Sequence, residues 1–247
     1  MSHPISVQLY TVRDQIAEDR DGVLRRIADI GFGAVEPFQP TEDPAGFRKV
    51  ADDLGLRVSA THAFALLGAE PGAVFEAVRT LGTDQAIVPA GIAEAEFTTR
   101  DGLARAADIL NALSVQAAEY DIQLGYHNHW WEFEPVIDGR HALEILADLV
   151  APEVFFEVDT YWAAVGGAEV PPVLARLGDR VKALHVKDGP VAKGTPNTAV
   201  GKGAMPVPAV LAAAPRDAWR VVELDFCDTD IFEALADSHR YLTELEK

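Results

Sequence analysis

The chain has 247 residues, of which 49% are hydrophobic and 24% charged, and its formal net charge is −18. This length and balance are typical of a globular protein with one large domain or two small ones. So acidic a chain repels nucleic acid and anionic membranes, which excludes both as general partners.

Cys227 is the single cysteine, so no intrachain disulfide forms and a reducing compartment is favoured. The beginning, MSHPISVQLY, lacks a charged segment followed by an apolar run, so we expect no signal peptide. No apolar stretch reaches the length of about 18 residues that predicts a membrane span. We therefore expect a soluble, cytoplasmic protein.

Eight short apolar segments, each suited to a strand buried on both faces, alternate with longer helical stretches. The predicted strands are residues 5–10, 34–38, 57–63, 85–90, 123–129, 154–160, 181–188 and 220–226. The predicted helices are residues 21–31, 43–56, 72–82, 100–121, 138–150, 170–179, 206–214 and 230–246. Gly31 and Gly55 stand where a helix of this pattern would stop.

Eight strand–helix units in this length predict an α/β fold, a single-domain (β/α)8 TIM barrel over residues 1–247. The alternative is a doubly wound open sheet, which is disfavoured because VQLYTVRDQ has no glycine to form a phosphate fingerprint. The Gly- and Pro-rich segment 189–208 follows the seventh strand. We expect it to be either a mobile substrate cover or a plain connecting loop.

Most of the predicted strands end in polar or ionisable residues, and active sites of barrels lie at these ends. Burying one unpaired ion costs several kcal/mol, so a whole ring of such residues needs compensation. One divalent cation would supply it, with manganese, zinc, cobalt or iron suiting histidine better than magnesium does. Residues two apart on a strand face the same side. The strand-end residues are Gln8, Tyr10, Glu36, His62, His127, Asn128, His129, Glu157, Asp159, His185, Lys187, Asp188, Glu223 and Asp225.

The segments SVQLYTVRD, YHNHWWEF, EVDTYWAAVGG, HVKD and VVELD together resemble the sugar phosphate isomerase/epimerase family, which has a xylose isomerase-like barrel. The resemblance covers nearly the whole chain and is greatest for a branch with YHNH followed by EF. It implies one divalent metal held by Asp159, His185 and Glu223. Many relatives have a glutamate as the fourth ligand, where His127 stands here by spacing, and Glu132 is the competing candidate.

The resemblance implies a metal-dependent isomerase or epimerase of carbohydrate metabolism, acting on a sugar, keto-sugar or cyclitol. Proton abstraction next to a carbonyl would pass through a metal-stabilised enediolate. His129 and Glu132 are the candidate catalytic bases. The substrate-binding candidates are Gln8, Tyr10, Glu36, His62, Trp131, Trp162 and Lys187.

Three alternatives remain open. A dehydratase or lyase could use the same site on a keto-sugar or inosose. An endonuclease IV-like DNA repair enzyme shares the barrel, but the net charge of −18 disfavours it. A non-catalytic carbohydrate-binding barrel would bind sugar without chemistry. Relatives often form dimers or tetramers, so the resemblance also implies a homo-oligomer.

Overall fold

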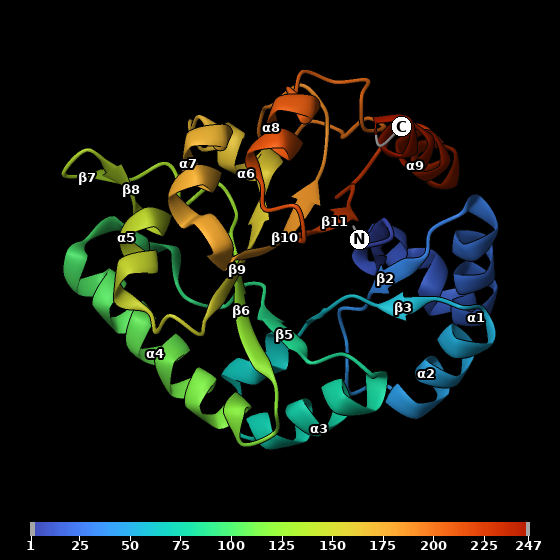
Figure 1. Ribbon diagram of the computed structural model, residues 1–247, viewed down its shortest axis with the longest axis horizontal. Coiled ribbons are helices and arrows are strands. Elements are labelled where there is room, and N and C mark those ends of the chain that lie inside the picture. Colours follow the sequence, from blue (N-terminus) through green and yellow to red (C-terminus); the bar gives the residue numbers. More distant parts are fainter. Residues whose placement is uncertain (1–2, 246–247) are drawn as a thin grey trace.

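The protein is a ring of parallel strands surrounded by helices (Figure 1). The computed structural model describes residues 3–245. The strand order is β3-β2-β1-β11-β10-β9-β6-β5-β4, and every pair within this sheet is parallel. The strands are β1 (Ser6–Gln8), β2 (Ala34–Glu36), β3 (Arg57–Val58), β4 (Thr61–His62), β5 (Gln85–Val88), β6 (Gln123–His127), β9 (Phe155–Asp159), β10 (Val181–Val186) and β11 (Trp219–Val222). The predicted TIM barrel is confirmed.

One extended segment closes the barrel. Residues 57–63 were predicted as one strand and form β3 and β4, separated by two residues. Ala34 of β2 aligns with Arg57, whereas Thr61 aligns with Ala86 of β5. The segment therefore changes partner halfway along and joins the two edges of the sheet.

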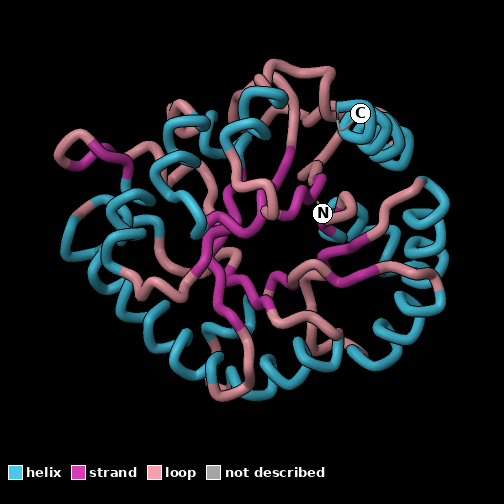
Figure 2. The backbone as a smooth tube through the Cα atoms, in the orientation of Figure 1, coloured by secondary structure: helices cyan, strands magenta, loops and turns pink. Residues whose placement is uncertain are grey.

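Helices form the outer layer of the barrel (Figure 2). They are α1 (Arg13–Ile30), α2 (Pro44–Asp53), α3 (Pro71–Leu81), α4 (Arg100–Ala118), α5 (Ala142–Leu149), α6 (Thr160–Val165), α7 (Val170–Leu177), α8 (Val207–Ala213) and α9 (Ile231–Leu245). Short 3-10 helices are η1 (Leu9–Val12), η2 (Phe64–Leu67), η3 (Glu94–Thr98) and η4 (Gly178–Arg180). No helix within residues 3–245 is both long enough and apolar enough to cross a membrane.

Two helices differ from prediction at their N-terminal ends. Helix α1 begins at Arg13 and is interrupted at Asp19, whose side chain accepts a hydrogen bond from the Gly22 amide. The predicted helix is the part after this break. Helix α5 begins at Ala142 because the residues before it form a hairpin of β7 (Val136–Ile137) and β8 (Arg140–His141).

Inward-facing side chains change character along the barrel. Two small apolar clusters fill the lower part, formed by Ala34, Ala183, Trp219 and Val221 and by Ala60, Ile87 and Phe155. Gly125 leaves room for the Phe155 ring, because an added Cβ would lie 2.4 Å from a ring carbon. Two residues further along most of these strands, the inward positions are ionisable, as at Glu36, His62, His127, Glu157, His185 and Glu223. The floor of the site therefore rests on a packed apolar layer.

Of the two roles expected for the segment 189–208, a substrate cover or a connecting loop, the structure favours the connecting loop. None of its residues lines the cavity at the strand ends. It is tied instead to α9, where Val200 N donates to Ser238 Oγ and Lys202 pairs with Asp237. It is also anchored to the barrel by the buried carboxylate of Asp188, which accepts four of its backbone N–H groups.

Candidate metal and substrate site

The carboxylate of Glu157 lies at the centre of three imidazoles. Its Oε2 is 2.6 Å from His62 Nε2, 3.0 Å from His127 Nδ1 and 3.1 Å from His185 Nε2. Burial would raise the pKa of Glu157, but His185 and His62 lower it well below its usual range. Sequence analysis left this residue without a role. Its position two residues before Asp159, on the same face of the strand, was the signal that could have assigned one.

Glu36 and Gln8 lie beneath these imidazoles. Oε2 of Glu36 is 2.8 Å from His185 Nε2 and accepts a hydrogen bond from Gln8 Nε2 at 2.7 Å. Burial, followed by repulsion from Glu157, raises the pKa of Glu36 to about 7. Both residues were predicted to bind substrate, yet neither lines the cavity.

A second donor group lies nearer the mouth and consists of Asp159, His185 and Glu223. One ligand atom from each lies within 4.8 Å of the others, and His185 Nδ1 is 2.6 Å from Glu223 Oε2. His127 belongs to the first group, but its Nε2 is 3.9 Å from Asp159 Oδ2. Burial lowers the pKa of His127 to about 3, so its ring is neutral, as a metal ligand must be.

Lys187 places a positive charge between the carboxylates at the mouth. Its Nζ lies 2.9 Å from Asp159, 2.7 Å from Glu223 and 3.0 Å from Asp225. Burial would lower the pKa of Lys187, but these carboxylates raise it well above its usual range. The space between Asp159 and Glu223 therefore suits a cation.

The donor set also fits a divalent ion. Oε1 of Glu36 and Oε1 of Glu157 are buried without a hydrogen-bond partner, which is costly unless another ligand satisfies them. Two donors that share an ion at bonds of about 2.1 Å lie no more than roughly 4.2 Å apart, and the 3.9 Å between His127 and Asp159 meets this limit. Mixed imidazole and carboxylate ligands are those that manganese, zinc, cobalt and iron accept.

Glu132 holds the turn that follows β6. Its Oε1 accepts a hydrogen bond from the Tyr126 hydroxyl at 2.6 Å, and its Oε2 accepts one from the His129 amide at 2.8 Å. Burial raises the pKa of Glu132 to about 7. The structure does not bring it to either donor group or to the cavity wall.

His129 reaches the cavity, with its ring stacked on Trp131 at a centroid distance of 4.1 Å. Burial, and then the neighbouring His127, lower the pKa of His129 well below its usual value. Its Nδ1 is buried and makes no hydrogen bond. Trp131 supports this ring from behind, and Trp130 rather than Trp131 lines the cavity beside Trp162.

The cavity above these residues has a volume of about 600 Å³ and combines a polar floor with an aromatic mouth. Its lining includes His62, His127, His129, Lys187, Glu223 and Asp225 below, and Tyr10, Phe38, Phe64, Trp130, Trp162 and Phe226 around the opening. Of the predicted substrate ligands it thus brings together Tyr10, His62, Trp162 and Lys187.

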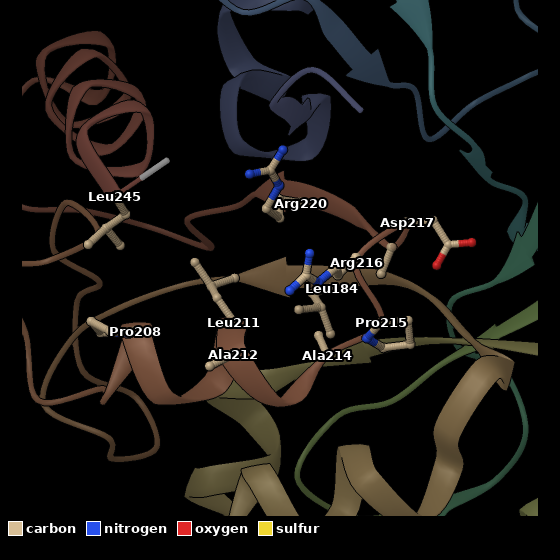
Figure 3. Close-up of a pocket in the computed structure, with 11 residues that line it drawn as sticks. Leu184, Pro208, Leu211, Ala212, Ala214, Pro215, Arg216, Asp217, Arg220 and Leu245 are labelled. Atoms are coloured by element: carbon tan, nitrogen blue, oxygen red, sulfur yellow. The ribbon is translucent and has the colours of Figure 1, made fainter. Parts of the chain in front are cut away.

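A larger cavity, of about 840 Å³, lies outside the barrel between α8, α9 and the loop that leads into β11 (Figure 3). Leu211, Leu245, Arg216 and Arg220 line it. It contains none of the predicted site residues and neither metal-donor group. The candidate site is therefore the one at the strand ends.

Solved structures share this fold at low sequence identity. Two crystal structures of sugar phosphate isomerase/epimerase proteins from Parabacteroides distasonis are 23% and 22% identical, with TM-scores of 0.76 and 0.79. They are matched over 96% and 97% of this chain and over 92% and 97% of their own chains. No curated protein matches the sequence.

Two further structures extend the likeness of fold. A probable 3-DHS dehydratase from Bacillus anthracis is 14% identical over 98% of this chain and 99% of its own, with a TM-score of 0.73. A xylose isomerase-like TIM barrel protein from Mycobacterium smegmatis, in complex with magnesium, is 14% identical over 98% and 96%, with a TM-score of 0.69. The family model of the xylose isomerase-like TIM barrel matches residues 24–243. The chain belongs to this family.

Proposed function

We propose that the protein is a divalent-metal-dependent isomerase or epimerase that acts on a sugar, keto-sugar or cyclitol. One observation carries the proposal: the donor group Asp159, His185 and Glu223 opens through Glu223 onto the cavity that His129 also lines, and the buried Nδ1 of His129 has no hydrogen-bond partner. Proton abstraction next to a carbonyl requires a cation-binding site beside an unprotonated base such as a neutral imidazole.

His127, Asp159, His185 and Glu223 are the proposed metal ligands. When bound, the ion polarises a substrate carbonyl and stabilises negative charge as it develops on the oxygen. Glu157 supports the ligand shell from below, because it accepts hydrogen bonds from both His127 and His185 and so fixes their ring orientations.

His129 is the proposed base. Its low pKa keeps the ring neutral at pH 7, so a ring nitrogen has a lone pair free to accept the proton from carbon. Stacking on Trp131 fixes the plane of the ring, and the bond from the His129 amide to Glu132 fixes its backbone. Glu132 is thus proposed as a positioning residue. Lys187, with three acidic partners, orients substrate hydroxyl groups.

The test combines metal content with hydrogen exchange at carbon. The metal-loaded enzyme is incubated with a panel of keto-sugars in deuterated water, and exchange next to the carbonyl is followed by NMR. We expect His129→Gln to keep about one metal ion per chain and to lose about 10²- to 10⁴-fold in exchange rate. The double variant Asp159→Asn/His185→Asn should lose both the metal and the exchange.

Val115→Ala, an exposed position on α4, is the matched control and should change neither readout. Undiminished exchange in His129→Gln would rule out this residue as the base. A wild-type protein that binds no transition metal would refute the proposed function. Loss of water from the substrate, rather than formation of an isomer, would assign the same site to a dehydratase.

A further inference from the structure

Four backbone N–H groups of the loop after β10 are already bonded within the protein and are not available to a substrate phosphate. In TIM barrels a phosphate is often held by the loops after the seventh and eighth strands, which here are β10 and β11. In the loop after β10 the carboxylate of Asp188 accepts hydrogen bonds from four backbone amides. Oδ1 accepts from the amides of Gly189 and Met205 at 2.8 and 3.0 Å, and Oδ2 accepts from Gly201 and Gly203 at 2.9 and 3.0 Å.

The cradle is built around this carboxylate. Asp188 is fully buried, and a Cβ added to Gly203 would lie 2.1 Å from its Oδ1. The loop after β11 is engaged in the same way: Leu224 N donates to Thr11 Oγ1 at 3.1 Å, and Asp225 N donates to Asn197 Oδ1 at 2.8 Å. These six amides are therefore committed within the protein.

Basic side chains do not make up for this. Within the described residues, Arg13 and Lys187 are the only Lys or Arg residues that line the cavity. Lys187 is surrounded by three carboxylates, of which Glu223 and Asp225 themselves line the cavity. Arg13 Nη1 donates to the carbonyl oxygens of Tyr10 and Asp225, and the guanidinium lies 4.3 Å from the Tyr10 ring centroid. A phosphate would therefore lie beside the carboxylates of Glu223 and Asp225, while both cations of the cavity wall are already engaged within the protein.

The mouth of the cavity is aromatic instead. Tyr10, Phe64 and Phe226 are the exposed aromatic side chains among residues 3–245, at 42%, 60% and 44% exposure, and all three line this one cavity. They come from three different segments, the 3-10 helices η1 after β1 and η2 after β4, and the loop after β11. Exposed apolar surface gathered around a polar floor is typical of a binding site.

We propose that the substrate is an uncharged, unphosphorylated glycoside whose reacting ring carries a ketone. Its reacting sugar lies on the polar floor, and a second ring packs its apolar face against Tyr10, Phe64 and Phe226. The assignment of the reacting ring rests on the proposed function, whereas the recognition of the second ring does not. The volume of about 600 Å³ lies well within the range of about 300–1,000 Å³ that holds ligands of this size.

Binding to the metal-loaded full-length protein is the test, followed by titration calorimetry. The probes are the phenyl glycoside, the methyl glycoside, the free sugar and the 6-phosphate of glucose, galactose and mannose. For at least one sugar we expect the phenyl glycoside to bind about tenfold more tightly than the methyl glycoside, and the phosphate to bind more weakly than the free sugar. Equal affinities of the two glycosides, tighter phosphate binding, or no binding across the panel would overturn the proposal.

Phe64→Ala should remove most of the phenyl preference and leave methyl glycoside affinity within about twofold, whereas Val115→Ala should leave both unchanged. Light scattering on the same variants tests whether a second copy of the chain, rather than a sugar ring, covers the aromatic side chains at the mouth. If Phe64→Ala dissociates an oligomer and keeps the phenyl preference, the mouth is a contact between copies and the proposal fails. The aldose glycosides carry no carbonyl and serve as binding probes only, so exchange is followed on the keto-sugars. A phenyl preference without exchange on any keto-sugar would refute the proposed function alone, and exchange on keto-sugars together with preferred phosphate binding would refute this inference alone.

Discussion

Glu132 is a buried carboxylate whose ionisation costs stability near neutral pH. Its pKa is raised to about 7 by burial, against an ordinary value of 4.5. The folded state therefore binds the proton more tightly than the unfolded state does. The resulting stabilisation is complete below about pH 4.5 and is lost as the pH rises through 7, by about 3 kcal/mol in all.

The substitution Glu132→Gln should remove this pH dependence and keep both hydrogen bonds. The amide oxygen can accept from the His129 N–H, and the amide nitrogen can donate to the Tyr126 hydroxyl oxygen. We expect the free energy of unfolding of the variant, relative to that of wild type, to be about 3 kcal/mol higher at pH 8 than at pH 4.5, as measured by urea unfolding at both pH values. Glu94→Gln, at an exposed glutamate, is the control. If the free energies of unfolding of wild type and Glu132→Gln differ by the same amount at both pH values, the raised pKa of Glu132 is contradicted.

The conformation of the loop from Gly189 to Met205 depends on hydrogen bonds to the side chain of Asp188. Asp188→Ala would leave four backbone N–H groups without their acceptor, and each unsatisfied buried donor costs about 1–3 kcal/mol. We expect a loss of at least about 3 kcal/mol and faster tryptic cleavage at Lys193 and Lys202. Formate or phosphate should restore part of the melting temperature by filling the cradle.

Asp228→Ala, which alters an exposed aspartate in the loop after β11, should change neither cleavage nor melting. The melting temperature and the rate of tryptic cleavage of Asp188→Asn should lie between those of wild type and Asp188→Ala, because the asparagine amide has a single acceptor oxygen. Unchanged proteolysis in Asp188→Ala would mean that the contacts of the loop with α9 hold it without the carboxylate.

Elements whose formation depends on nearby residues were mostly predicted from the sequence, whereas features that depend on distant contacts were not. All eight strands were found, because strands buried on both faces are continuous apolar runs. The break at Asp19 and the hairpin turned by Asp138 and Gly139 were missed, although an Asp-Gly pair is a known hairpin signal. The sequence did not decide between a cover and a connecting loop for residues 189–208, because Gly and Pro content indicates irregular backbone but not what anchors it. The anchor is Asp188, and its four bonds depend on the folded loop.

The candidate site shows the same limit at the scale of the whole molecule. The period of two along each strand predicted which side chains point inward, and the structure brings most of these residues together. Pairing across the barrel was not predictable in this way. Glu157 contacts histidines from β4, β6 and β10, so its role becomes visible only when the ring closes.

Closure of the ring also predicts how the whole molecule responds to metal. Five carboxylates lie close together at one end of the barrel, in a protein whose net charge is already −18. They are those of Glu36, Glu157, Asp159, Glu223 and Asp225. A cation that binds the folded barrel and not the unfolded chain stabilises it by mass action, by about 2.7 kcal/mol at a concentration 100 times the Kd. For a chain of this length we expect the Tm to rise by roughly 5–10 °C when manganese, cobalt or zinc is added to chelator-treated protein.

Calorimetric melting of the chelator-treated protein, with and without each ion, measures this shift. Calcium, which prefers six to eight oxygen ligands, should raise the Tm much less than a transition metal, because two of the proposed ligands are imidazoles. The double variant Asp159→Asn/His185→Asn should show no shift with any of the ions. A wild-type Tm that is indifferent to all of them would mean that Lys187 and the histidines already neutralise the carboxylates, and that the ring is a self-contained polar core.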